Sequence, residues 1–530
     1  MQNQSSVTKS AFILSFAGIL CKCISIIYTP ILNNILGEKG YGLYCQVLEV
    51  FLFIYSITTV GAQPAVTKVV AESIALEKSN NTKNITKILF VSMKVYLKIG
   101  LLGGFILSIL SIPLSNILGK DSFYGIISLV PCILITCLLS VSRGFLQGYN
   151  NMNPIGISQI VEQFFNVIVS LLCSYLFMKY TNNIAWGVCG AQIGTSIGAF
   201  ISILYIKFTV LRKVDTVKVE NRAFNRISKK LFLYSIPIII NAGLQNFGGV
   251  VDMLNVKSRL LSSGITLDGA DILYGHYGLY KTLIGVPMVI ITAISSIILP
   301  SIAKYTTIHA KKKIIINIKL AYKIVLLIVI PASLGLSIVS ELLYISLFNN
   351  NHGYGMMTIG SFILILMALT QIQTSIMQGL NKLYFLLKTF FIGIIIKILL
   401  NYIFVSMRSI NIYGVLIGNC AWYLIPCILN HRMICKCIKH KLLVFKYLIK
   451  PIIASIIMIL PLILINKFFI YPIQINRLFC IIILLIQIFI AIIIYFYIMI
   501  LIGGVKRKDI NAVSPKLFNM IPRYIISRLK

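Results

Sequence analysis

The sequence contains few charged residues, and acidic residues are the scarcest of them. Asp and Glu together number 13 in a chain of 530 residues, and all charged residues make up 12%, whereas about a quarter is usual in soluble proteins. The composition therefore argues against a soluble globular protein. The 12 cysteines include no Cys-x-x-Cys pair and no Cys/His spacing that suits zinc, so neither a metal site nor another cofactor is expected.

Long hydrophobic runs take the place of the missing charge. Hydrophobic residues make up 58% of the chain, and runs of about 20 residues suit α-helices that cross a bilayer rather than β-strands. We therefore predict an all-α membrane protein with about 14 transmembrane helices. The predicted spans are 10–36, 43–71, 89–112, 124–147, 155–178, 184–207, 229–256, 273–303, 317–340, 356–378, 383–406, 411–430, 447–470 and 478–502.

Positive charge is concentrated in one set of the loops between these runs. The formal net charge is +35. Most Lys and Arg of the loops lie in the stretches 78–87, 212–230, 311–313 and 432–441, whereas the alternate loops hold scattered cations. Basic loops stay on the cytoplasmic side, so both termini are predicted to be cytoplasmic. The same bias accounts for the net charge without nucleic acid as a partner.

A repeat divides the chain. Tyr-Gly-Leu-Tyr occurs at 41–44 and again at 277–280, and Gln-Gly-Tyr-Asn at 147–150 resembles Gln-Gly-Leu-Asn at 378–381 in the same order. Each copy contains six predicted spans, an even number, so both copies insert with the same orientation. Such parallel repeats form two lobes related by an axis along the membrane normal, and the substrate binds between them near mid-membrane.

The predicted organisation follows from this repeat. Its parts are an N-terminal six-helix lobe at 1–210, a cytoplasmic linker at 211–228, a C-terminal six-helix lobe at 229–440, a helix pair at 441–502 and a cytoplasmic basic tail at 503–530.

Charged residues also fall inside predicted spans, where an ionisable side chain costs roughly 2.5–3.5 kcal/mol and so must face water or a partner. Lys22, Glu49, Asp252 and Lys281 lie in the first, second, seventh and eighth spans. Polar residues at steps of three and four share a face with each of them. We expect these four helices to line a central, water-accessible cavity. Two structural ion pairs, Lys22–Glu49 and Asp252–Lys281, are the alternative.

The candidate site combines these charges with nearby polar residues. The expected substrate-binding residues are Lys22, Lys281, Arg259, Ser25 and Thr29, and the expected coupling or ion-pair residues are Glu49, Asp252 and Glu162, with Lys397 as a further candidate. Isolated Ser and Thr residues also commonly join helices in membrane bundles, and this remains the other interpretation of the hydroxyls.

Several further residues are given plain structural roles. Arg143 is expected near the cytoplasmic interface, with its charge extended toward water. The tyrosines of 41–44 and 277–280 are expected in the aromatic belts at the membrane surface. The Asn-x-Thr sequences at Asn80 and Asn84 fall in a cytoplasmic loop, so no glycosylation is expected there.

Two stretches of the sequence resemble a known family. They are "TKSAFILSFAGILCKCISIIYTPILNNILGEKGYGLYCQVLEVFLFIYSITTVGAQPAVTKVVAE" and "VDMLNVKSRLLSSGI" followed by "YGHYGLYKTLIGVPMVIITAISSIILPSIAK". Both resemble the stage V sporulation protein B family, in the polysaccharide-transport branch of the MOP superfamily (multidrug/oligosaccharidyl-lipid/polysaccharide exporters), which is similar to the bacterial lipid II flippase. The resemblance implies two six-helix lobes plus a helix pair, a central cavity lined by helices 1, 2, 7 and 8, and a hydrophobic groove at helices 13 and 14.

The resemblance also bears on substrate contacts. Lipid II flippases hold the pyrophosphate with cationic cavity residues, largely arginines. In this chain Lys22 and Lys281 occupy cavity-type positions, and the arginine set is not reproduced one for one.

We therefore predict a flippase of the cell membrane and not an enzyme. It would export an undecaprenyl-pyrophosphate-linked glycan, a peptidoglycan precursor such as lipid II or one for the spore cortex, by alternating access. The expected partners are the lipid-linked oligosaccharide, membrane lipid and a coupling cation. The alternative is a cation-coupled multidrug exporter of the same superfamily. A membrane-embedded transferase is disfavoured, because the loops are short and hold no phosphate-cradling or metal motif.

Overall fold

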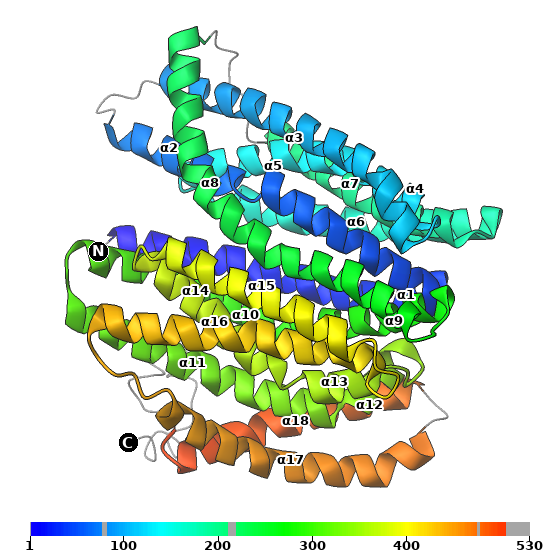
Figure 1. The fold of residues 1–530 in the computed structure, drawn as a ribbon. Coiled ribbons are helices and arrows are strands. Elements are labelled where there is room, and N and C mark those ends of the chain that lie inside the picture. Colours follow the sequence, from blue (N-terminus) through cyan, green and yellow to red (C-terminus); the bar gives the residue numbers. More distant parts are fainter. Residues whose placement is uncertain (1, 77–81, 210–218, 474–476, 505–530) are drawn as a thin grey trace. The chain divides into compact units, whose positions relative to one another are not determined.

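The described part of the chain is built from helices alone. The computed structural model describes residues 2–76, 82–209, 219–473 and 477–504, and no strand occurs among them (Figure 1). The predicted tail from 505 onward, linker residues 211–218 and Asn80 lie outside the described residues. The elements in chain order are α1 (Gln2–Thr58), α2 (Ala62–Leu76), α3 (Thr82–Leu118), α4 (Ser122–Ser128), α5 (Val130–Gly148), α6 (Asn153–Thr181), α7 (Ile184–Thr209), α8 (Asn221–Val251), the π-helix η2 (Asp252–Val256), α9 (Lys257–Ser262), α10 (Leu267–Thr307), α11 (Lys311–Ile338), α12 (Ser340–Phe348), α13 (Tyr354–Gly360), α14 (Ile363–Gly379), α15 (Leu383–Phe404), the 3-10 helix η3 (Asn411–Tyr413), α16 (Gly414–Ile438), α17 (Phe445–Ile473) and α18 (Arg477–Leu501).

Most of these helices are long and apolar enough to cross a membrane. Within the described residues there are 12 such helical segments, or 13 when the bent pair α13 and α14 is counted as one span. One segment, Phe16–Ile74, has 59 residues, whereas a single crossing needs about 20. If this segment is counted as two crossings and the bent pair as one, the total rises from 13 to the 14 that the sequence predicts. The prediction of an all-α, multi-pass membrane protein is confirmed.

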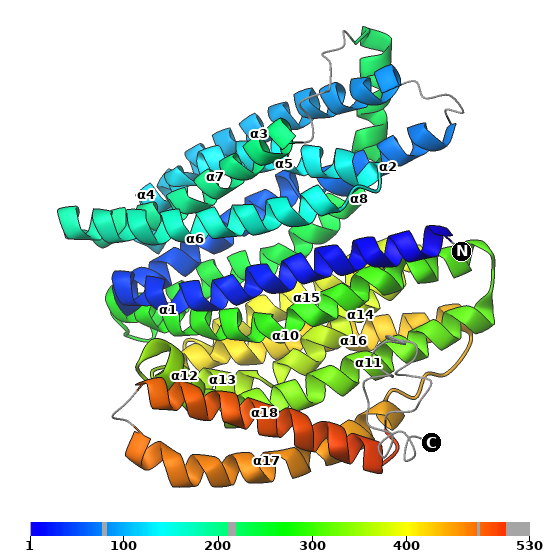
Figure 2. The same cartoon turned by 180° about the vertical axis from the view of Figure 1, so that it is seen from behind.

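The reversal inside α1 occurs at a glycine. Gly37 has φ 70° and ψ 170°, outside the helical range, and this backbone conformation is open to glycine and strained for other residues. Figure 2 shows the chain turning back on itself within α1. The first two predicted spans therefore form a helical hairpin although α1 is nearly continuous.

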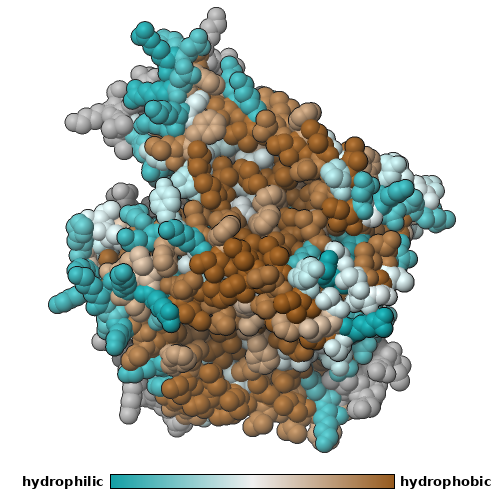
Figure 3. All heavy atoms as spheres, in the orientation of Figure 1, coloured by the Kyte–Doolittle hydropathy of each residue, from teal (hydrophilic) through white to brown (hydrophobic). Residues whose placement is uncertain are grey.

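Hydrophobic side chains cover the middle of the helices on the face drawn in Figure 3, and hydrophilic ones gather near the helix ends. Large apolar side chains stay exposed along individual helices: Leu102 of α3 is 62% exposed and Phe489 of α18 is 66% exposed. Water would penalise such exposure, but lipid chains do not, because they are as apolar as the side chains themselves.

The described chain forms two compact units. The first comprises Met1–Ala293 with Leu383–Trp422, and the second comprises Ile294–Lys382 with Tyr423–Lys530. The predicted lobes at 1–210 and 229–440 follow from the sequence repeat, which is a different criterion from compactness, and they remain a prediction.

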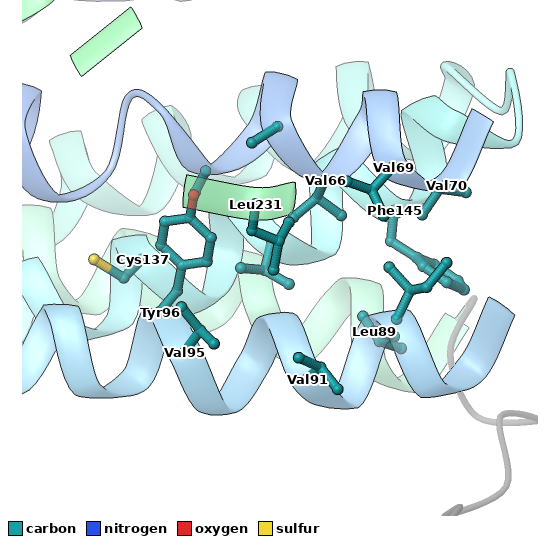
Figure 4. Packing of buried hydrophobic residues seen from close by; sticks show 14 of the residues in the cluster. Val66, Val69, Val70, Leu89, Val91, Val95, Tyr96, Cys137, Phe145 and Leu231 are labelled. Carbon is teal, nitrogen blue, oxygen red and sulfur yellow. The ribbon is translucent and has the colours of Figure 1, made fainter. Parts of the chain in front are cut away.

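In the first unit, α2, α3 and α5 pack against one another and against α8. Val66 of α2, Tyr96 of α3 and Phe145 of α5 are buried in one cluster with Leu231 of α8 (Figure 4). Helices in lipid gain little from hydrophobic burial, so close van der Waals packing of this kind supplies the association. A Cβ at Gly144 or Gly148 of α5 would overlap α2, so these two glycines let α2 and α5 approach closely.

In the second unit, polar side chains attach the last two helices to α11 and to each other. The amide of Asn466 in α17 donates to the carbonyl of Ile338, and Gln487 of α18 donates to the Asn466 side chain at 2.6 Å. The Tyr495 hydroxyl of α18 donates to the carbonyl of Leu327 in α11. Helix pairs in lipid are commonly joined by such hydrogen bonds.

Candidate functional site

The two copies of Tyr-Gly-Leu-Tyr pack against each other in the first unit. A Cβ atom at Gly42 of α1 would overlap the carbonyl oxygen of Asp271 in α10, and a Cβ at Gly278 would overlap the Sγ of Cys45. Glycine is therefore required for this close crossing, as at many helix contacts in membranes. The duplicated motif thus lies at a close contact between α1 and α10.

The tyrosines of this motif are buried, so their assignment to aromatic belts is wrong. Tyr41, Tyr44, Tyr277 and Tyr280 are each 8% exposed or less, whereas belt residues face the lipid headgroups. The crossing of α1 and α10 at these positions encloses the rings.

Lys22 of α1 lies against the face of α10 that carries Lys281. The Nζ of Lys22 in α1 lies 3.0 Å from the position that a Cβ of Gly285 would take. Gly285 lies one helical turn beyond Lys281, and residues four apart share a helix face. No hydrogen bond or ion pair joins the Lys22 side chain to another described residue. The Lys22 ammonium therefore lies against α10 one helical turn from Lys281.

Glu49 is the carboxylate of this cluster, and its partner is Lys281. The Nζ of Lys281 donates to Glu49 Oε1. The ion pair Lys22–Glu49, which the sequence left open as an alternative, is therefore not formed. A Cβ at Gly249 of α8 would overlap the Glu49 carboxylate, so this glycine admits the acidic group between the helices. The Lys281 side chain remains 37% exposed.

The charges of this cluster do not cancel. Lys22 and Lys281 contribute two positive charges and Glu49 one negative charge, so a net positive charge remains between α1, α8 and α10. We call the group formed by Lys22, Glu49 and Lys281 the lysine cluster. Its chemistry suits an anion with several acceptor oxygens, because an ammonium group offers three donors and no acceptor.

The hydroxyls predicted beside Lys22 make local bonds. Thr29 is buried and donates to the carbonyl of Ser25, and Ser25 donates to the carbonyl of Cys21. Ser25 also accepts from the amide of Gln163 in α6 at 3.2 Å. The bond from Gln163 joins α1 to α6, and a role of either hydroxyl in substrate binding remains a prediction.

Glu162 belongs to a separate network, and the expected direction of the Arg143 side chain, toward water, is wrong. The Arg143 guanidinium of α5 donates to Glu162 Oε2 of α6 at 2.6 Å and to the hydroxyls of Ser158 and Ser202. Its side chain is 11% exposed. The arginine therefore turns inward to a carboxylate of the bundle instead of extending toward water.

Asp252 is also paired differently from the predicted alternative, the ion pair Asp252–Lys281. Its carboxylate accepts from Lys397 of α15 at 2.9 Å, and both side chains are almost fully buried. Lys281, the alternative partner, is bound to Glu49. Arg259 lies elsewhere, with its guanidinium 4.1 Å from the ring centre of Tyr402.

One buried ion pair was missed by the sequence analysis. Lys257 donates to Asp271 and to the carbonyl of Leu118, while Gln46 donates to Asp271 at 2.7 Å. The predicted spans end at 256 and begin again at 273, so both charged residues were counted as loop residues. In the structure α9 continues to Ser262 and α10 begins at Leu267. The cost of charge inside a span would have singled them out had the span limits been wider.

This chain is similar to one protein family and to individual bacterial proteins of known name. A family described as polysaccharide biosynthesis protein matches residues 7–306. Stage V sporulation protein B of Bacillus subtilis (strain 168) is 25% identical over 313 residues, which are 56% of this chain and 58% of that protein. The match thus spans less than two thirds of that relative. Lipid II flippase MurJ of the same organism is 24% identical over 455 residues, 81% of this chain and 82% of that protein.

Solved structures share the fold. An inward-facing multidrug resistance MATE family transporter of the MOP superfamily has a TM-score of 0.63 at 16% identity, covering 79% of this chain and 96% of that one. Lipid II flippase MurJ in an inward closed conformation has a TM-score of 0.60 at 16% identity, covering 93% and 97%. At such identities the likeness establishes the fold alone. The family match covers more than half of the sequence, and the chain therefore belongs to the polysaccharide biosynthesis protein family.

Proposed function

We propose that the chain is a flippase that exports a polyprenyl-pyrophosphate-linked glycan, a peptidoglycan precursor such as lipid II, by alternating access. The family, and relatives named as a lipid II flippase and as stage V sporulation protein B, support transport of a cell-wall lipid rather than enzymatic catalysis. The latter name also favours a role in the spore cortex. The headgroup of such a lipid cannot cross hydrocarbon unaided, because removing a pyrophosphate from water costs too much.

The observation that carries this proposal is the lysine cluster. A pyrophosphate offers several anionic oxygens, and hydrogen bonds between ionised groups are roughly twice as strong as neutral ones. Lys22 has no ion-pair partner among the described residues, and Lys281 is bound to Glu49 but partly exposed. An incoming anion would bind Lys22 directly and compete with Glu49 for Lys281.

When no substrate is bound, the Glu49 carboxylate would take the place of the substrate's anionic group beside Lys281. A carboxylate paired with Lys281 lowers the cost of holding that ammonium inside the membrane. When the pyrophosphate leaves, the ion pair forms again, which favours release. A membrane potential that is negative inside assists export of an anion by about 2.3 kcal/mol per charge per 100 mV.

The polyprenyl tail of the substrate would remain in the bilayer, where it meets apolar side chains. Apolar side chains of α17 and α18 are exposed along their length, among them Leu460, Leu464 and Leu485. They suit contact with a polyprenyl chain, and the groove that the family resemblance implies at this helix pair belongs to the proposal.

The test is complementation of a bacterium depleted of its lipid II flippase. The wild-type chain is expected to restore growth. Lys22→Ala and Lys281→Ala are each expected to reduce export about tenfold or more, since each removes a charge-assisted contact. Lys94→Ala, at an exposed lysine of α3, is the matched control and should rescue fully. Full rescue by a Lys22→Ala/Lys281→Ala double variant that reaches the membrane would refute the role of the lysine cluster.

A cation-coupled multidrug exporter is the second candidate. The likeness to a MATE transporter, with a TM-score of 0.63, favours it. The same strains distinguish the two functions: resistance conferred on a drug-sensitised host, together with failure to rescue the flippase-depleted one, would select the exporter. The net positive charge of the lysine cluster argues against it, because it disfavours cationic drugs.

A further inference from the structure

Asp252 and Lys397 form the centre of a second polar site, which the proposed function does not use. The Lys397 ammonium donates to Asp252 Oδ2 and to the carbonyl of Gly248, both at 2.9 Å. The Tyr277 hydroxyl donates to the same Asp252 oxygen at 2.7 Å, and the Asn401 amide donates to the other at 3.0 Å. Four helical segments, α8 with η2, α10 and α15, thus meet at a single carboxylate.

The site is closed, and its backbone is irregular. Asp252 is 1% exposed and Lys397 is 3% exposed. Asp252 opens the π-helix Asp252–Val256, and π-turns inside α-helices occur frequently at functional sites. Asn419 of α16 supports the arrangement by donating to the Tyr277 hydroxyl at 2.8 Å.

The ammonium takes the place that a cation bound to this carboxylate would take. It contacts a carboxylate oxygen and a backbone carbonyl oxygen, the types of oxygen that commonly bind small hard cations. One positive and one negative charge leave the site neutral. A second cation would bring two positive charges close together in a medium where charges interact strongly, so it would be repelled.

We propose that Lys397 is the permanent, tethered cation of the Asp252 site and that this carboxylate binds no sodium or lithium ion from solution. The coupling cation expected at Asp252 from the sequence is thereby replaced by a side chain of the protein itself. The two other expected coupling carboxylates are likewise paired with cations of the protein, Glu49 with Lys281 and Glu162 with Arg143. The inference does not rest on the proposed function, because its test measures stability and not transport.

The experiment follows thermal unfolding of the purified full chain in detergent, in sodium, lithium or choline chloride at equal ionic strength. The wild type is expected to unfold at the same temperature in all three salts. Lys397→Ala is expected to lower the unfolding temperature by roughly 5 °C in choline chloride, since it leaves a buried carboxylate without its partner. Sodium or lithium should recover part of this loss by entering the vacated position.

Two controls make the result specific. In an Asp252→Asn/Lys397→Ala variant the carboxylate is gone, so sodium and lithium should recover nothing. Lys388→Ala removes an exposed lysine of the same helix and should behave as the wild type in every salt.

Two outcomes would overturn the inference. One is a wild type stabilised by sodium or lithium over choline in a manner that Asp252→Asn abolishes. The other is a Lys397→Ala variant that matches the wild type or gains nothing from either ion. If Lys397→Ala does not fold, the wild-type comparison still decides, together with Lys397→Arg, which keeps a tethered cation and should be indifferent to the salt.

Discussion

At the scale of single residues, most of the charged side chains described inside the helices have a partner of opposite charge, and Lys22 is an exception. Lys257 is fully enclosed and has Asp271, the carbonyl of Leu118 and the side chain of Gln46 around it. Removing one member of such a buried pair leaves the other charge uncompensated, and this is more harmful than removing both.

The Lys257–Asp271 pair gives the first prediction. Lys257→Met should destabilise the chain by about 3–5 kcal/mol, because Asp271 is left buried and unpaired. Lys257→Met combined with Asp271→Asn should cost less than the single change. Thermal unfolding in detergent measures both variants. A single variant as stable as the wild type, or a double variant less stable than the single one, would contradict this account.

At the scale of elements, glycines decide where helices cross. The sequence repeat identified Gly42 and Gly278 as equivalent positions, but only the structure places them at a contact between α1 and α10. Gly18 lies in the same helix α1, and among the described residues no atom of another helix lies within 4 Å of where its Cβ would be. Gly42 is therefore needed for the close contact with α10, whereas Gly18 is not needed for a helix contact.

Gly42→Ala should lower stability by about 1–3 kcal/mol, because the added methyl group would meet the rigid backbone at Asp271 and force the helices apart. Gly18→Ala is the matched control and should change stability by no more than about 0.5 kcal/mol. Thermal unfolding and the amount of folded protein in membranes measure the difference. Equal effects of the two substitutions would show that α1 and α10 do not need a glycine crossing.

The sequence indicates which charged residues lie inside helices, but it does not indicate which of them form ion pairs. Lys22, Glu49, Asp252 and Lys281 were found because they interrupt clearly apolar runs. Their pairing was not found, since Lys281 lies 232 positions from Glu49 and Lys397 lies 145 positions from Asp252. A pattern of three- and four-residue steps describes one helix face and carries no information on which other helix packs there.

At the scale of the whole molecule, the distribution of basic residues predicts the orientation in the membrane. Positive loops resist translocation, so the loop with Lys311, Lys312 and Lys313 should stay in the cytoplasm and the loop near residue 350 should lie outside. Both termini would then be cytoplasmic.

Alkaline phosphatase fusions measure this orientation, because the enzyme is active only outside the cytoplasm. A fusion after residue 350 should be active, and one after residue 310 should be inactive. Replacing Lys311, Lys312 and Lys313 by Gln should weaken the difference between the two fusions. The reverse pattern of activity would overturn the predicted orientation.

The sequence by itself determined the class of this protein, its helices and its repeat. Hydrophobic run length and loop charge are local properties, and lipid imposes them on each span separately. The tertiary structure alone decided which charges are neutralised. Lys397 balances Asp252, Lys281 balances Glu49, and Lys22 has no ion-pair partner among the described residues. These relations depend on how helices distant in the chain cross, and no property of a single helix specifies them.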